Sequence, residues 1–265
     1  MGVQLSWLVI LLVFGGVVLG SYAWQTRIDL WPRQAQYRFP AVAIIAAAVG
    51  LVVAIVPIAR RTWVLSALGL VGGGFVSWMF LSLLHESVMG ASLRWLWIVV
   101  SAVVAGLSVA TLERVVERVD GWRGGVVVSV LAGLLALGAT MSFANAPLIL
   151  GPVAMVSLAT VPAAVIFPGH VYMRGVGATA AIVIVGVVVF ANWFGDRERW
   201  VMYALLVAAP LSTGLCLLPR ISRRGATLRL VAAALPAVVI AGIQAARAIP
   251  PLIESMSQSD GGYDY

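Results

Sequence analysis

The sequence contains no lysine, a single cysteine and two histidines. Without lysine no Schiff base can form, which excludes a retinal protein and a lysine-dependent aldolase. Cys216 stands alone in an apolar segment, so it can form neither an intramolecular disulfide nor a thiolate metal site by itself. With so few histidine and cysteine ligands, the sequence predicts no closed zinc site within this chain.

Charge is scarce as well. Only 10% of the 265 residues are charged and 62% are hydrophobic, whereas soluble domains average about 25% charged residues. The stretch Gly124–Gly169 contains 46 residues and no charge, about twice the ~20 residues that one helix needs to cross a hydrocarbon core. Its polar midpoint, Ser142–Pro147, predicts two crossings joined by a tight turn.

The hydrophobic pattern predicts an all-α fold, a polytopic transmembrane helix bundle of about nine spans, because helices satisfy every backbone group inside lipid. Residues 1–248 are expected to form one integral membrane domain. Residues 249–265 are expected to form a polar, disordered tail after Pro250 and Pro251 end the last helix. The nine expected spans are Leu5–Ser21, Ala41–Ala59, Thr62–Leu84, Arg94–Ala110, Gly125–Met141, Leu148–Phe167, Val176–Phe194, Trp200–Leu218 and Leu228–Ala248.

Two segments are typical of short amphipathic helices at the membrane surface. In Tyr22–Pro40, tryptophans at helical spacing alternate with arginines. In Thr111–Trp122, Leu112, Val115, Val116, Val119 and Trp122 mark one face, and Glu113, Arg114, Glu117, Arg118 and Asp120 mark the other. We expect this helix to leave the membrane and bend along its surface, with its charges in solvent. No ionisable residue is expected near the centre of a span.

The arginines predict an orientation in a bacterial cytoplasmic (inner) membrane, because cytoplasmic loops carry more basic residues. Ten arginines fall in the turns after the second, fourth, sixth and eighth spans, and seven fall on the other side. The N-terminus is therefore predicted to be cytoplasmic and the C-terminus to lie outside.

Four polar residues are the candidates for a site. His85 and Glu86 could together bind a metal or move a proton, but adjacent helical side chains diverge by about 100°, which favours a solvated helix end. Asn145 precedes Ala146 and Pro147 and suits a turn; alternatively, two half-helices meet there at mid-membrane, with Asn145 at a substrate site. His170 lies in a loop predicted to be on the opposite side from His85, which argues against a shared haem.

No catalytic, cofactor-binding or metal-binding residue is predicted, and no cofactor is expected. The chain lacks the serine-hydrolase, phosphate-loop and zinc-protease motifs, so the pattern leans away from an enzyme. The arginines are scattered, so nucleic acid is not an expected partner. Membrane lipids, other membrane subunits or a second copy of this chain are the expected partners.

The sequence favours a non-catalytic membrane-embedded subunit or scaffold of a larger complex. A transporter or channel for a small or lipid-like solute is the first alternative, motivated by Pro57, Pro210, Asn145 and the glycines of Gly69–Gly74. Those glycines predict a helix-packing face or, alternatively, the wall of a cavity. A lipid-modifying enzyme with His85, Glu86 and Arg94 at one interface is the second alternative.

Overall fold

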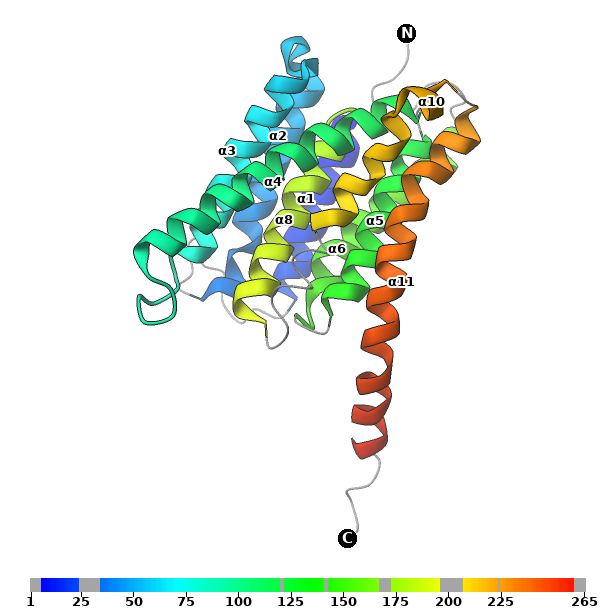
Figure 1. The fold of residues 1–265 in the computed structure, drawn as a ribbon. Helices are drawn as coiled ribbons and strands as arrows, with labels where there is room; N and C mark the ends of the chain where they lie inside the picture. The colour runs from blue at the N-terminus through cyan, green and yellow to red at the C-terminus, as the bar shows by residue number, and fades with distance from the viewer. Residues whose placement is uncertain are drawn as a thin grey trace.

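The computed structural model describes residues 6–23, 34–119, 122–140, 143–166, 173–195, 207–223 and 225–259, and all regular secondary structure in these ranges is helical (Figure 1). A further short helix covers residues 207–212. In chain order the other elements are α1 (Ser6–Tyr22), η1 (Ala35–Arg38), α2 (Phe39–Ile55), η2 (Pro57–Arg60), α3 (Thr62–Leu81), α4 (Ala91–Arg118), α5 (Trp122–Ala139), α6 (Ala146–Leu158), α7 (Thr160–Ile166), α8 (Val176–Phe194), η3 (Thr213–Leu217), α10 (Pro219–Ser222) and α11 (Ala226–Ser259).

Six helical segments in the described residues are long and apolar enough to cross a membrane, which suggests an integral membrane protein. They are η1 with α2, then α3, α4 and α5, then α6 with α7, and α8. Three shorter apolar segments, α1, residues 207–217 and the first half of α11, fall where the sequence predicts the other spans. The prediction of an all-helical fold is confirmed, but the count of nine spans is not.

Prolines explain where several helices stop. Val56 is extended, as a residue before proline prefers, so α2 ends at Ile55 and Pro57 opens η2 instead of kinking a longer helix. The predicted span Leu148–Phe167 is divided at Ala159 into α6 and α7. Pro162 causes this break, because its ring conflicts with the carbonyl four residues earlier, at the last residue of α6.

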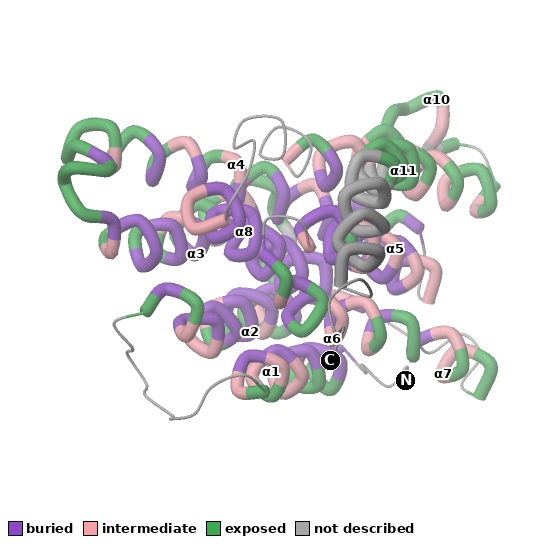
Figure 2. Tube along the Cα trace, turned by 90° about the horizontal axis from the view of Figure 1, so that it is seen from below, coloured by how far each residue is buried: buried purple, intermediate pink, exposed green. Residues whose placement is uncertain are grey.

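The centre of the bundle is α8. Every residue from Val176 to Asn192 is buried, and α2, α3, α4 and α5 all contact this helix. Figure 2 shows the buried positions concentrated at α8 and the exposed positions on the outward sides of its neighbours. Since α8 is apolar on every side, its sequence already matches a helix enclosed by protein.

The glycine run of α3 is a packing face, as the first of the two sequence interpretations predicted. A Cβ atom added at Gly73 would lie 2.0 Å from Ala105 Cβ, and one at Gly69 would lie 2.8 Å from the Ala105 carbonyl oxygen. Small residues therefore bring the backbones of α3 and α4 together.

The interpretation of α4 needs correction. The helix runs unbroken from Ala91 to Arg118, so residues 111–118 continue the span as one helix. Leu112, Val115 and Val116 are buried as predicted, but Glu113, which the pattern assigned to the solvated face, is buried with them. The interfacial helix predicted around Trp24 and Trp31 lies largely outside the described residues; η1, at its end, begins at Ala35.

The last helix also differs from expectation. Helix α11 continues through Pro250 and Pro251 to Ser259, so the two prolines do not end it. A helix of 34 residues is about 50 Å long, and its final turns extend beyond the other helices (Figure 1). Carbonyls freed by a proline can be satisfied by water where a helix projects from the bundle.

Candidate functional site

The carboxylate of Glu113 is fully buried, with none of the residue exposed. It lies in the last two turns of α4 and meets the first turn of α8. The backbone N–H of Gly175 donates to Oε1 with an N···O distance of 2.6 Å, and the N–H of Ala178 donates to Oε2 at 3.1 Å. Sequence reasoning missed this residue as a buried group.

These two bonds reproduce a capping box between two distant parts of the chain. In the usual capping box, the side chain of the N-cap residue accepts a hydrogen bond from the backbone N–H of the third helical residue. The side chain of that third residue accepts a hydrogen bond from the backbone N–H of the N-cap residue. Here the N-cap residue is Gly175, which has no side chain, and the third residue is Ala178. Glu113 supplies both acceptors, and its charge also faces the positive end of the α8 dipole.

Three glycines allow the backbones to close around this carboxylate. Gly175 has φ of +84°, and a Cβ atom there would lie 2.2 Å from the Gly50 carbonyl oxygen. A Cβ at Gly50 would lie 1.9 Å from Thr179 Oγ1, and one at Gly177 would lie 2.8 Å from the carbonyl carbon of Leu112. Helices α2, α4 and α8 therefore meet at backbone contact distance.

The charged groups that act on the Glu113 carboxylate are Arg174 and Glu117. Arg174 lies just before α8, and its guanidinium donates a hydrogen bond to the Val56 carbonyl after the end of α2, with an N···O distance of 3.1 Å. Glu117, one turn along α4, forms an ion pair with Arg114 at 3.2 Å. The site is thus a charged junction of three helix ends, which we call the carboxylate end of the bundle.

Several arginines donate hydrogen bonds to the terminal carbonyls of helices, just as Glu113 accepts hydrogen bonds from the first N–H groups of α8. Arg229, near the start of α11, donates to the Arg118 carbonyl at the end of α4 at 2.6 Å. Arg38 is buried and donates to the Met79 carbonyl in the last turn of α3. Cations near the terminal carbonyls of a helix are favourable, so these side chains connect one helix to the end of another.

The opposite end of the bundle is closed by phenylalanines, and we call it the aromatic end. Phe39, at the start of α2, contacts Phe80, Phe143 and Phe190 with ring centroids 5.4–5.5 Å apart. Phe143 and Phe190 are 4.5 Å apart, and Phe194 stacks on Phe190 at 5.2 Å. Such offset and edge contacts add to the packing energy of the rings.

The residues singled out from the sequence that the structure describes are not brought together at one site. His85 and Glu86 are exposed in the turn between α3 and α4, and His85 Nδ1 lies 3.0 Å from Ser87 Oγ. Asn145 occupies the N-cap position of α6, and its side chain makes no capping hydrogen bond. The helical segments on both sides of Asn145 are each long enough to cross a membrane, which favours the turn interpretation of Asn145 over the half-helix alternative. His170 lies outside the described residues.

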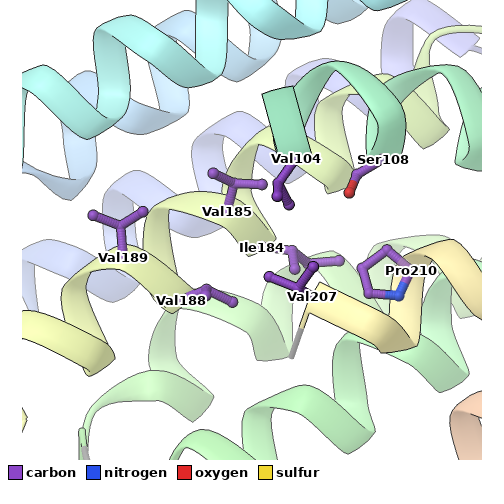
Figure 3. A pocket seen from close by; sticks show the side chains of 8 residues that line it. All are labelled: Val104, Ser108, Ile184, Val185, Val188, Val189, Val207 and Pro210. Carbon is purple, nitrogen blue, oxygen red and sulfur yellow. The ribbon is translucent and has the colours of Figure 1, made fainter. Parts of the chain in front are cut away.

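One small cavity lies between α4, α8 and the helix over residues 207–212 (Figure 3). Its volume is about 10 Å³, comparable with the space one water needs. Ser108 supplies the one polar side chain among its eight lining residues. A larger, open groove of about 450 Å³ lies at the aromatic end, where Gln34, Gln36 and Phe194 contribute to its wall.

The contacts of Glu113 indicate a structural role for this side chain. Both carboxylate oxygens are engaged by backbone donors, and in the described ranges no three His, Cys, Asp or Glu side chains gather closely enough to hold a metal ion. The fold and this junction define the class of protein: an all-helical bundle of membrane-protein composition whose interior charges connect helix ends. No family model matches the sequence, and neither a curated protein nor a solved structure matches it.

Proposed function

We propose that this chain is a non-catalytic, membrane-embedded subunit or scaffold of a larger complex. The observation that supports it is the filling of the bundle around α8. This helix is buried along almost its whole length, one of its ends is fixed by Glu113, and the other packs into the phenylalanine cluster. Packing of this kind favours a rigid body over a conduit.

The grounds for a transporter are weakened by the same packing. The glycines of α3 that could have lined a cavity contact α4 instead. The cavity beside α8 has room for about one water and is mainly apolar (Figure 3). The grounds for a lipid-modifying enzyme are weakened too, since Arg94 donates to the carbonyls of Leu84 and Met89, a structural use of its guanidinium.

Partner subunits, or a second copy, would be held through the outer apolar surface. Trp63, Val71 and Phe75 of α3 are 64%, 68% and 47% exposed, and Leu19 of α1 is 73% exposed. Lipid can cover such a surface as well as protein can, so helix association in membranes depends on shape and packing. Stable association is therefore the property that the experiment must measure.

The test is extraction of the full chain from its native membrane into polymer-bounded lipid discs, followed by native mass measurement. The proposal expects a particle of defined stoichiometry that contains this 27.9 kDa chain with another subunit or a further copy of itself. A lone monomer at every protein concentration and in every mild extraction would overturn the proposal.

We also propose a bacterial inner-membrane location with a cytoplasmic N-terminus. Hydrogen bonds bring the turns that follow α2, α4 and α10 to the carboxylate end, since Arg174 reaches Val56 and Arg229 reaches Arg118. Together with the turn before α8, these turns and the helix ends beside them contain ten of the 17 arginines, and an excess of arginine favours the cytoplasmic side.

Single-cysteine labelling tests this orientation. Cys216 is buried, so a Cys216→Ala background can receive Gly90→Cys before α4 or Gly225→Cys before α11, and both glycines have open space around them. In intact cells an impermeant maleimide should label position 90 and should label position 225 only after permeabilisation. The reverse pattern would invert the orientation, and equal labelling would contradict opposite-side placement.

A further inference from the structure

A second feature of the carboxylate end concerns its outer surface, around α10. Arg220 and Arg223 are exposed on this short segment, and Arg118 is exposed at the end of α4. Arg123 is half-buried at the start of α5, with its guanidinium carbon 5.2 Å from the ring centroid of Trp122. We call these four arginines the basic corner.

The elements that contain the four arginines form one continuous set of packed helices. Helix α11 contacts α5 and η3, η3 contacts α4, and α10 contacts both η3 and α11. Arg229 adds a hydrogen bond from α11 to the Arg118 carbonyl at the end of α4. In Figure 1 α10 lies at the margin of the bundle, at the end where α4 finishes.

The positive charge of this corner is not neutralised by the described acidic side chains around it. Glu113 is buried against α8, and Glu117 is paired with Arg114. Asp120, which lies outside the described residues, is one carboxylate against four arginines. The corner therefore has a net positive charge available to an anion.

Apolar side chains stand beside the arginines on the same turns. Leu215 and Leu218 precede α10 and are 46% and 50% exposed, and Leu228 follows it at 48%. Guanidinium groups beside exposed leucines and a tryptophan match the chemistry of the membrane interface, where phosphate lies next to acyl chain. Arginine binds phosphate through paired N–H donors.

We propose that the basic corner binds the headgroup of an anionic phospholipid, with Arg220 and Arg223 on its phosphate and the neighbouring leucines against its acyl chains. Charge complementarity and the adjoining apolar side chains select this occupant. A lipid is also present at high local concentration wherever apolar helices hold the corner at the edge of a bilayer. The inference is separate from the proposed subunit role, because a monomer could bind such a lipid equally well.

The experiment measures lipid preference of the full chain reconstituted in bilayers of phosphatidylcholine and phosphatidylglycerol. Spin-labelled versions of the two lipids report the relative association constant at the protein surface. The wild-type chain should prefer phosphatidylglycerol, and Arg220→Gln/Arg223→Gln should lose up to about fivefold of that preference for each arginine removed. A high-salt measurement should weaken the wild-type preference, because screening shortens the reach of exposed charges.

Matched variants locate the effect. Arg60→Gln/Arg61→Gln removes two charges from the turn after α2 and should leave most of the preference intact. Arg220→Lys/Arg223→Lys keeps the charge and should retain most of the preference, which separates charge loss from misfolding. Equal loss in both glutamine variants, or no preference in the wild type, would overturn the inference. So would a glutamine variant at α10 that keeps its lipid preference but loses a protein partner from the native particle.

Discussion

The two ends of the bundle are closed mainly by different chemistry, although buried Arg38 also donates to the end of α3 at the aromatic end. At the carboxylate end, backbone meets backbone at Gly50, Gly175 and Gly177, and a charged side chain satisfies the donors that the contact leaves. At the aromatic end, large rings such as Phe39 and Phe190 pack against one another between the helices. The packing at the carboxylate end depends on the absence or presence of single atoms. The packing at the aromatic end depends on the total volume of the side chains. The two ends should therefore respond very differently to substitution.

The sharpest difference should appear at Gly175. Gly175→Ala introduces a Cβ atom where φ is +84° and where the Gly50 carbonyl oxygen would be 2.2 Å away. A left-handed alanine costs about 1–2 kcal/mol and overpacking costs a further ~1–3 kcal/mol, so the chain should lose roughly 2–5 kcal/mol of stability. Unfolding by SDS in mixed micelles measures this. Gly90→Ala, with open space around it, is the control and should unfold like the wild type.

The next effect should follow removal of the buried carboxylate. Glu113→Ala leaves two N–H groups without acceptors, at about 1–3 kcal/mol each, so we expect a loss of about 3 kcal/mol. Glu113→Gln keeps one acceptor oxygen and should lose roughly half as much. Glu117→Gln, one turn away in a partly exposed pair, should change stability by less than ~0.5 kcal/mol. Equal stability of Glu113→Ala and the wild type would refute the junction.

The aromatic end should tolerate a change that conserves volume. Phe39→Ala should cost about 2 kcal/mol, less than the ~3–5 kcal/mol of water-soluble cores, because lipid rather than water surrounds the unfolded span. Phe39→Leu should cost less than ~1 kcal/mol, since it keeps most of the volume. The same mixed-micelle unfolding applies. If Phe39→Leu were as damaging as Gly175→Ala, the contrast between the ends would be wrong.

The smallest effect should come from Asn145, which occupies an N-cap position at the aromatic end. Its side chain makes no capping hydrogen bond to α6, whereas Glu113 caps α8 from another helix. Asn145→Ala should therefore change stability by less than ~0.5 kcal/mol, below the ~1 kcal/mol typical of a lost N-cap. A larger loss would show that Asn145 has a structural use that its backbone position alone does not explain.

Much of the helical fold follows from composition and periodicity, because apolar runs of span length can satisfy their backbone in lipid only as helices. The packing of the glycines in α3 also follows from sequence. The residues at which α2 and α6 end depend on the local backbone geometry at Pro57 and Pro162. A hydropathy pattern does not show this geometry. The count of nine spans is not confirmed, because the apolar segments of α1, of residues 207–217 and of α11 are shorter than the six clear candidates.

Glu113 could not be located from its own neighbours. It follows Leu112 and adjoins Arg114 on an amphipathic pattern, so it lies at the boundary between the two faces. The sequence signal lies instead at the start of α8. The N-cap residue of this helix is Gly175, so no Ser, Thr, Asp or Asn caps it. The backbone N–H groups of a buried, uncapped helix start need acceptors from elsewhere in the protein. The acidic residue that supplies this acceptor is set by the tertiary structure, because Glu113 lies 62 residues from Gly175 in the chain.

The central place of α8 has a consequence for biogenesis. The ribosome completes α1 to α6 before α8 exists, yet all of these helices contact α8 in the folded protein. Chains are made from the N-terminus onward, so the early helices enter the membrane around an unfilled position. The nascent bundle can close only when its seventh apolar segment arrives, and the carboxylate on α4 has no donor until that moment.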